Sequence, residues 1–175
     1  MKHLLKLLDL STEEITDILN LADQLKYEQK HGIPHNILKG QKASTRTRDS
    51  IETGMYQRGG QALFLSSRDL QIGRGEPVQD TARVLSRYLS GIMIRTFAQK
   101  EVEDLAEYGS IPIINGLTDY CHPCQVLADL QTVREHKNKL DGLKFCYIGD
   151  GNYMANSLTV GALKVGMSVS LGCPE

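Results

Sequence analysis

Hydroxyl and guanidinium side chains are concentrated in one short segment, Ser44-Thr45-Arg46-Thr47-Arg48, directly before a stretch of helical character that runs from Asp49 to Arg58. Unpaired backbone N–H groups and the helix dipole favour negative charge at a helix start, and guanidinium groups bind phosphate through paired hydrogen bonds. The segment therefore predicts a site for a phosphate dianion. An ordinary helix cap with solvated arginines is the alternative interpretation.

Two further segments place polar groups where an apolar run ends. Arg95 closes the run 91–94 and is expected to project from the carboxyl end of a strand. His122 and Gln125 stand where a loop passes into a helix, and they offer a neutral imidazole donor and a carboxamide to a polar substrate. His122 taken alone fits a helix cap equally well, so the prediction depends on the three segments together.

The elements that must position these residues are short apolar runs that alternate with helical patterns. A capping box at Ser11-Thr12-Glu13-Glu14 opens a helix that runs to about His31-Gly32, before Pro34. Strands are predicted near 62–65, 91–94, 111–114, 145–148 and 167–171, and helices near 77–90, 99–108, 122–137 and 152–165. This order predicts an α/β fold in which helices flank a parallel sheet, with ligands beyond the carboxyl ends of the strands.

The best candidate for a domain boundary is the charged stretch 134–142. We therefore predict a binding domain over residues 1–141. Residues 142–175 hold only a strand, a helix and a strand, which either complete the first sheet or begin a second α/β domain.

Composition excludes several classes of function. Twenty basic and twenty-one acidic residues leave a net charge of -1, which argues against nucleic acid or anionic lipid as partners. No apolar run approaches the roughly 18 residues of a membrane helix and no signal peptide is recognisable, so a cytoplasmic protein is expected. The four cysteines are expected to be reduced.

Cys121 and Cys124 allow one alternative from another class, a thiol redox pair at a helix start. A zinc site that adds Cys146 and Cys173 is less favoured, because those two cysteines lack a second paired spacing.

Ser44–Arg48, Met93-Ile94-Arg95-Thr96 and His122-Pro123-Cys124-Gln125 together resemble the carbamoyl-phosphate motifs of the aspartate/ornithine carbamoyltransferase family, and Asp80–Leu85 strengthens the match. Nearly the whole chain resembles the amino-terminal half of a bacterial ornithine carbamoyltransferase. The resemblance implies transfer of a carbamoyl group from carbamoyl phosphate to the side-chain amine of ornithine, which gives citrulline and phosphate in arginine metabolism. It also implies that no metal or cofactor is needed and that the subunits form a homotrimer with active sites between them.

The resemblance also implies roles for single residues. Ser44, Thr45, Arg46 and Thr47 would hold the phosphate, and Arg95 would bridge the phosphate and the carbonyl oxygen. His122 and Thr47 would polarise that oxygen, and Gln125 would hold the carbamoyl amide. The residues implied to be catalytic are Arg46, Arg95 and His122.

Further implied contributions come from loops. Gln71 resembles a residue supplied by the neighbouring subunit, although a flexible polar loop is the simpler interpretation of its segment. Asn152 and Tyr153 stand in the loop that faces ornithine. Tyr153 occupies a position at which the family has an asparagine that binds the amino acid, which weakens the case for ornithine recognition.

The sequence departs from the family before the first motif. An apolar strand leads into that motif in the family, whereas Ile37-Leu38 is the only apolar pair between Pro34 and Ser44. We therefore expect that the sheet lacks one strand or that a loop carries the motif. Arg58 continues the stripe of Ile51 and Met55 on the following helix, as expected of a helix face with nothing to bury against.

The chain ends at Glu175, before the family's remaining ornithine-binding segments. We therefore expect that this chain alone is incomplete for catalysis. An inactive engineered or truncated scaffold that retains the motifs is the main alternative.

Overall fold

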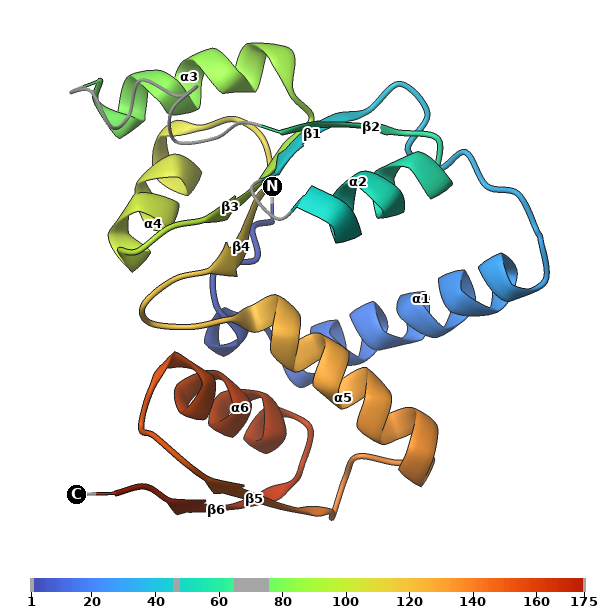
Figure 1. The fold of residues 1–175 in the computed structure, drawn as a ribbon, viewed down its shortest axis with the longest axis vertical. Coiled ribbons are helices and arrows are strands. Elements are labelled where there is room, and N and C mark those ends of the chain that lie inside the picture. Colours follow the sequence, from blue (N-terminus) through green and yellow to red (C-terminus); the bar gives the residue numbers. More distant parts are fainter. Residues whose placement is uncertain (1, 46–47, 65–75, 175) are drawn as a thin grey trace. The chain divides into compact units, whose positions relative to one another are not determined.

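The computed structural model describes residues 2–45, 48–64 and 76–174, without the side chains of 44, 45 and 48–50. Helices and strands alternate along most of the chain (Figure 1). Their order is η1 Leu7–Asp9, α1 Thr12–Lys30, β1 Lys42–Thr45, α2 Arg48–Gln57, β2 Gln61–Phe64, α3 Val78–Tyr88, β3 Gly91–Arg95, α4 Gln99–Tyr108, β4 Ile113–Leu117, α5 Pro123–Lys137, β5 Lys144–Ile148, α6 Tyr153–Lys164 and β6 Ser168–Gly172. The predicted α/β class is confirmed.

Four strands form one sheet in the order β2-β1-β3-β4, and every neighbouring pair is parallel. Ser44 of β1 is in register with Leu63 of β2 and with Ile92 of β3. Because all four strands run in the same direction, their carboxyl ends share one edge of the sheet, where ligands of such folds bind.

The expectation that the sheet lacks the strand before the first motif is wrong. β1 lies between β2 and β3 and ends at Thr45, so a short interior strand does lead into the motif. Its residues are polar or small, and Ala43 is its only apolar side chain. Pairing in a sheet uses backbone N–H and C=O groups, which these residues supply as well as apolar ones do. For the same reason a search for apolar residues misses the strand.

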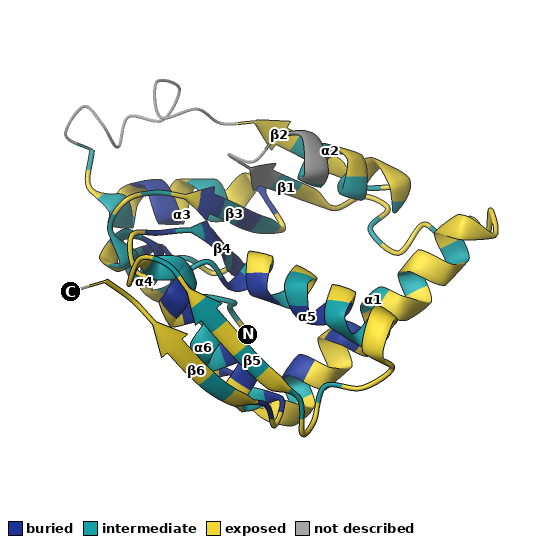
Figure 2. Cartoon of the chain, turned by 60° about the horizontal axis from the view of Figure 1, so that its bottom comes forward, coloured by how far each residue is buried: buried dark blue, intermediate teal, exposed yellow. Residues whose placement is uncertain are grey.

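One face of this sheet carries a hydrophobic core. Ile92 and Ile94 alternate along β3 and are buried with Ile113 of β4 against α3 and α4, whose contributions include Val102 and Leu105. Figure 2 shows this burial in dark blue along β3 and β4. Full burial of such a side chain contributes about 1.5–3 kcal/mol, so this face anchors the two strands.

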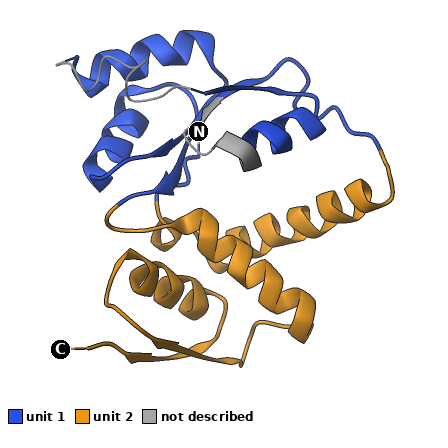
Figure 3. Cartoon of the chain, viewed as in Figure 1, with its two compact units in different colours: residues 1–5, 34–118 blue, residues 6–33, 119–175 orange. Residues whose placement is uncertain are grey.

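The chain divides into two compact units, residues 1–5 with 34–118 and residues 6–33 with 119–175 (Figure 3). The sheet described above belongs to the first unit. The domain boundary that we predicted between residues 141 and 142 is a separate matter from these two units, and it stays a prediction.

The second unit contains the three α-helices α1, α5 and α6, the short 3₁₀ helix η1 and a two-stranded parallel sheet, β5-β6. α1 begins with the predicted capping box, in which Ser11 and Glu14 each accept a hydrogen bond from the other's backbone N–H. α5 and α6 approach closely at Gly161, where an added Cβ would lie 2.3 Å from a methyl carbon of Val126. No helix that the structure describes is long and apolar enough to cross a bilayer.

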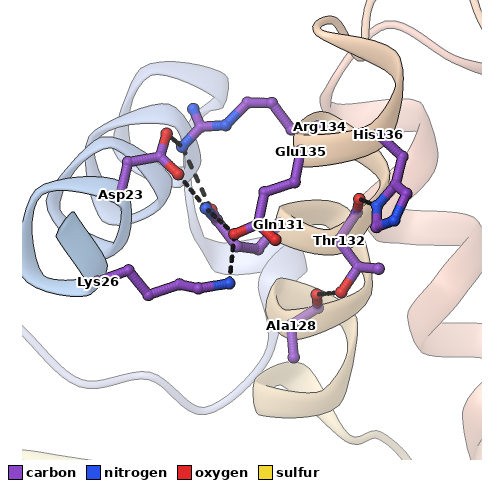
Figure 4. A network of polar contacts seen from close by, with 8 residues as sticks. All are labelled: Asp23, Lys26, Ala128, Gln131, Thr132, Arg134, Glu135 and His136. Atoms are coloured by element: carbon purple, nitrogen blue, oxygen red, sulfur yellow. Dashed lines mark hydrogen bonds and ion pairs between the residues drawn. The ribbon is translucent and has the colours of Figure 1, made fainter. Parts of the chain in front are cut away.

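Polar contacts join α1 to the last turns of α5 (Figure 4). Arg134 donates to Asp23 and Asn20, Gln131 donates to Asp23, and Lys26 pairs with Glu135. Arg134 is the best shielded of the charged groups, with 18% of its side chain exposed, whereas the Lys26 side chain is 65% exposed. Exposed ion pairs contribute little to stability, so Arg134 is the main polar tie between the two helices.

Candidate functional site

The first motif spans the step from β1 to α2. β1 ends at Thr45 and α2 begins at Arg48, so a helix of 10 residues starts at the carboxyl edge of the sheet. This backbone arrangement is the one in which a helix start binds an anion. Arg46, Thr47 and the side chains of Ser44 and Thr45 lie outside the described residues, so their roles in holding phosphate stay predictions.

Arg95 is the last residue of β3 and its side chain is exposed. The pairing with β4 shifts between Ile94 and Arg95, which brings Arg95 into register with Leu117. Gly116 makes room for the arginine, because a Cβ at that position would lie 3.0 Å from Arg95 Cγ. The Thr96 N–H donates to the Leu117 carbonyl over 3.0 Å and fixes the backbone just beyond the arginine.

Ser44 and Arg95 lie on neighbouring parallel strands. Ser44 is opposite Ile92, and Arg95 follows Ile92 by three residues on the same strand. A strand rises by about 3.3 Å per residue, so Arg95 stands roughly 10 Å beyond the level of Ser44, toward the carboxyl edge of the sheet.

A polar cluster at the end of β4 supports this edge, and the sequence analysis missed it. Asn115 is fully buried, and its Nδ2 donates to the Leu5 carbonyl at 2.9 Å and to Gln99 Oε1 at 3.3 Å. Thr118 Oγ1 donates to the same Gln99 oxygen at 2.7 Å. The cluster ties the end of β4 to the first turn of α4. A polar residue within an otherwise apolar strand was the one available signal.

His122 is the N-cap of α5, as the alternative interpretation predicted. Its Nδ1 accepts a hydrogen bond from the Gln125 backbone N–H over 3.3 Å, and Pro123 follows at the first helical position. An accepting Nδ1 carries no proton, so the neutral ring holds its proton on Nε2. The cap therefore selects the tautomer in which Nε2 is a donor, and the two interpretations of His122 are compatible.

Ser157 of α6 fixes the backbone at His122, and no sequence pattern indicated it. Its hydroxyl accepts from the His122 N–H at 2.8 Å and donates to the Tyr153 carbonyl at 2.7 Å. Ser157 is only 4% exposed, so water has little access to its hydroxyl. Ser157 thus connects the histidine predicted to polarise the substrate to Tyr153, which the resemblance placed in the loop that faces ornithine.

The other predicted residues of the second unit hold local bonds. Gln125 is exposed, and its Nε2 donates to Asp129 over 3.0 Å. Asn152 is the N-cap of α6, where its Oδ1 accepts from the Met154 N–H at 2.9 Å. Tyr153 is the first residue of α6 and is half-buried. Gln71, predicted to act in a neighbouring subunit, lies outside the described residues.

The redox alternative finds no support in the thiols. Cys121 is buried. Burial of the Cys124 thiol, together with its interaction with the nearby Cys121, raises the pKa of Cys124 to about 11. A redox cysteine needs a lowered pKa, because the thiolate is the reacting species. Cys146 and Cys173 are exposed in the same unit. Within the described residues, no group of three or more His, Cys, Asp or Glu side chains could hold a metal ion.

Known proteins resemble nearly the whole chain. Residues 2–135 match the family model "Aspartate/ornithine carbamoyltransferase, carbamoyl-P binding domain". The ornithine carbamoyltransferase of Oceanobacillus iheyensis is 56% identical, over 99% of this chain and 56% of its own length, and that of Carboxydothermus hydrogenoformans is 54% identical, over 99% and 58%. A solved structure of ornithine carbamoyltransferase from Pyrococcus furiosus has a TM-score of 0.93 at 45% identity, over 99% of this chain and 59% of that one.

The chain thus spans somewhat more than half the length of the curated relatives that it matches. The match to the Oceanobacillus protein extends over 181 aligned positions, whereas this chain has 175 residues. At least six positions of that relative therefore have no counterpart here. The resemblance to an amino-terminal half, in shortened form, is confirmed.

Proposed function

Because the chain belongs to the aspartate/ornithine carbamoyltransferase family, we propose that it binds carbamoyl phosphate and that the whole protein transfers the carbamoyl group to ornithine. The observation that carries the proposal is the position of α2, which starts at the carboxyl end of the interior strand β1, beside the strand that ends in Arg95. An anion there meets the N-terminus of a helix and a guanidinium group from the adjacent strand.

In the proposed reaction the side-chain amine of ornithine attacks the carbonyl carbon of carbamoyl phosphate. A C–N bond forms, the bond between the carbonyl carbon and the oxygen that bridges to phosphorus breaks, the amine loses a proton, and phosphate leaves with that oxygen. Negative charge develops on the carbonyl oxygen in the tetrahedral intermediate. A hydrogen-bond donor that is already positioned for such an oxygen typically lowers the activation free energy by about 3 kcal/mol.

Arg95 and His122 are the donors that we assign to this oxygen, together with Thr47. The His122 tautomer supports the assignment, since an Nδ1 that accepts from the Gln125 N–H leaves the proton on Nε2. Arg46 with Ser44, Thr45 and Thr47 would bind the phosphate. Gln125 would exchange its bond to Asp129 for the carbamoyl amide.

Titration calorimetry of this chain with carbamoyl phosphate, and with a bisubstrate phosphonate analogue, tests the binding step. We expect saturable heat and a loss of at least tenfold in affinity for Arg95→Ala. Arg87→Ala is the matched control, because Arg87 is an exposed arginine on α3 of the same unit. Absence of saturable heat with either ligand would refute the binding proposal.

One observation favours a second candidate, an inactive scaffold that keeps the motifs. β1 has only four residues and pairs with β3 over two positions, which is little support for a binding loop. The scaffold hypothesis expects Arg46→Ala and Arg95→Ala to leave the affinity for phosphate analogues unchanged. The calorimetry above therefore separates the two candidates.

Assembly and the second substrate belong to the same proposal. We infer a homotrimer in which Gln71 serves a neighbouring subunit, and an ornithine site beside Asn152 and Tyr153. Sedimentation of the chain at several concentrations tests the trimer. Citrulline formation by the whole protein tests ornithine as the acceptor, and Tyr153→Asn is expected to improve its use. The cytoplasmic location stays a prediction from the sequence.

A further inference from the structure

Arg95 leaves β3 beside the polar cluster formed by Gln99, Asn115 and Thr118. The register pairs Arg95 with Leu117, and Asn115 and Thr118 stand two positions before and one position after Leu117. All of these residues belong to the first unit. Asn115 and Thr118 are 0% and 1% exposed, whereas Arg95 is exposed. Burial of a polar group is costly unless the group is hydrogen-bonded, so the place of these two side chains requires an explanation.

The bonds of the cluster converge on the first turn of α4. Gln99 is the first residue of this helix, and its Oε1 accepts from Thr118 Oγ1 at 2.7 Å and from Asn115 Nδ2 at 3.3 Å. Asn115 Nδ2 also donates to the Leu5 carbonyl, at 2.9 Å. Hydrogen bonds are stronger in a low dielectric than in water. The buried cluster therefore fixes the start of α4 relative to the end of β4.

The short loop that joins Arg95 to α4 is held by further contacts. The Thr96 N–H donates to the Leu117 carbonyl at 3.0 Å, and the Thr96 hydroxyl donates to Glu101 on α4. A Cβ added at Gly116 would lie only 3.0 Å from Arg95 Cγ, so β4 lies close against the stem of the arginine. β4 and α4 thus restrain both the backbone beyond Arg95 and the first part of its side chain.

We propose that Gln99, Asn115 and Thr118 are positioning residues that hold Arg95 in the arrangement in which it binds carbamoyl phosphate. This role rests on the proposed function, which assigns Arg95 to the ligand. Asn115 and Thr118 are too deeply buried to touch a ligand, so they act through Arg95. A binding group that is ordered in advance raises affinity, because the ligand does not have to order it.

A double-mutant cycle between Thr118 and Arg95 tests the proposal. Thr118→Val removes the hydroxyl that donates to Gln99 and retains most of the side chain. We expect it to weaken carbamoyl phosphate binding by about tenfold in the folded chain, and by less than about twofold when Arg95 is already alanine. Equal losses in the two backgrounds would overturn the proposal, because the cluster would then act independently of Arg95.

Two further threonine variants are the matched controls. Thr118→Ser keeps the hydroxyl and is expected to bind within about threefold of the unaltered chain. Thr81 is a buried threonine of α3, and its hydroxyl has no hydrogen-bond partner within the described part of the chain. Thr81→Val is therefore expected to leave the affinity unchanged. A loss for Thr81→Val as large as that for Thr118→Val would contradict a specific role of the cluster.

Amide hydrogen exchange of the ligand-free chain separates this proposal from the proposed function. The Thr96 N–H reports on the backbone just beyond Arg95, and the Ile92 N–H, which donates to the Pro112 carbonyl at 2.9 Å, is the reference on β3. Thr118→Val is expected to speed exchange at Thr96 by about tenfold relative to Ile92. An unchanged ratio would overturn the positioning role even if the chain binds carbamoyl phosphate.

The two results have separate meanings. An unaltered chain that does not bind carbamoyl phosphate would refute the proposed function, and the exchange ratio would then decide whether the cluster orders the backbone at Arg95. Gln99→Met removes the shared acceptor at the half-buried start of α4 and is the second variant if Thr118→Val does not fold. It is expected to change affinity and exchange in the same direction, and no change in either would overturn the proposal.

Discussion

Replacement of Ser157 by alanine tests whether the link between α6 and His122 holds the site together. The hydroxyl accepts from the His122 N–H at 2.8 Å and donates to the Tyr153 carbonyl at 2.7 Å, and the residue is 4% exposed. Alanine removes both bonds. The Tyr153 carbonyl belongs to the hydrogen-bond ladder of α6, so the larger cost arises at the His122 N–H, which loses this acceptor in a partly buried position.

A buried donor that loses its partner costs about 1–3 kcal/mol, and we expect Ser157→Ala to lower the free energy of unfolding by that amount. Urea denaturation measures it. Asn156→Ala is the neighbouring control, because Asn156 is exposed on the same helix and its loss is expected to change stability by about 0.5 kcal/mol or less. Ser157→Thr keeps the hydroxyl, and a space of about 30 Å³ borders Ser157.

The same variants separate stability from binding. If Ser157 orients His122, Ser157→Ala weakens binding of the phosphonate analogue under conditions in which the chain is still fully folded, and Ser157→Thr restores it. Unfolding free energies that are equal for Ser157→Ala and Asn156→Ala would refute the reasoning, because the bond would then have no net effect on stability.

Three further predictions concern the second unit. Gly161→Ala is expected to cost about 1–3 kcal/mol of stability, because its Cβ would lie 2.3 Å from a Val126 methyl carbon, and a Val126→Ala background is expected to relieve the cost in urea denaturation. The raised pKa of Cys124, about 11 against about 9 for an exposed thiol, stabilises the fold fully below pH 9, and this contribution is lost as the pH rises toward 11. Between those pH values the Cys124→Ala variant is therefore expected to lose about 1–3 kcal/mol less of its free energy of unfolding than the unaltered chain. An equal loss in both proteins would contradict the raised pKa of Cys124. Reaction with a thiol reagent at pH 8 is expected to modify Cys146 and Cys173 rapidly and the other two cysteines slowly; fast reaction of Cys124 would revive the redox hypothesis.

Elements with side-chain signals could be predicted from the sequence. The capping box at Ser11 and the break at Pro34 bracket α1, and the structure ends this helix at Lys30, followed by Gly32 at a φ of +66°. α4 occupies Gln99–Tyr108, the predicted range. Both helices depend on local side-chain features, namely which residues are buried and which residues cap the ends. These features can be recognised in a single sequence.

Features that depend on pairing between distant segments could not be predicted in this way. β1 forms from Lys42–Thr45 because β2 and β3 offer backbone partners on both sides. The four side chains of this segment do not by themselves predict a strand. The bond from His122 to Ser157 joins residues 35 positions apart and depends on how α6 packs against α5. The N-cap role of His122 was the alternative interpretation made from the sequence, but the tautomer that results from it required the geometry.

The weakness of β1 bears directly on the proposed function. An interior strand of a parallel sheet normally gains about 1.5–3 kcal/mol from each large apolar side chain that it buries, and β1 offers only Ala43. β1 and the start of α2 are therefore expected to open more readily than β3 and β4. A protein whose binding-competent form is only partly populated binds its ligand more weakly by that fraction. Gly54→Ala raises the helix propensity of α2 at a position where an added Cβ meets only Arg58 Nη1, at 3.8 Å, and should then slow amide hydrogen exchange in β1 and raise phosphate affinity together. Slower exchange with unchanged affinity would mean that the order of β1 does not limit anion binding, and the weak strand would then be no argument for an inactive scaffold.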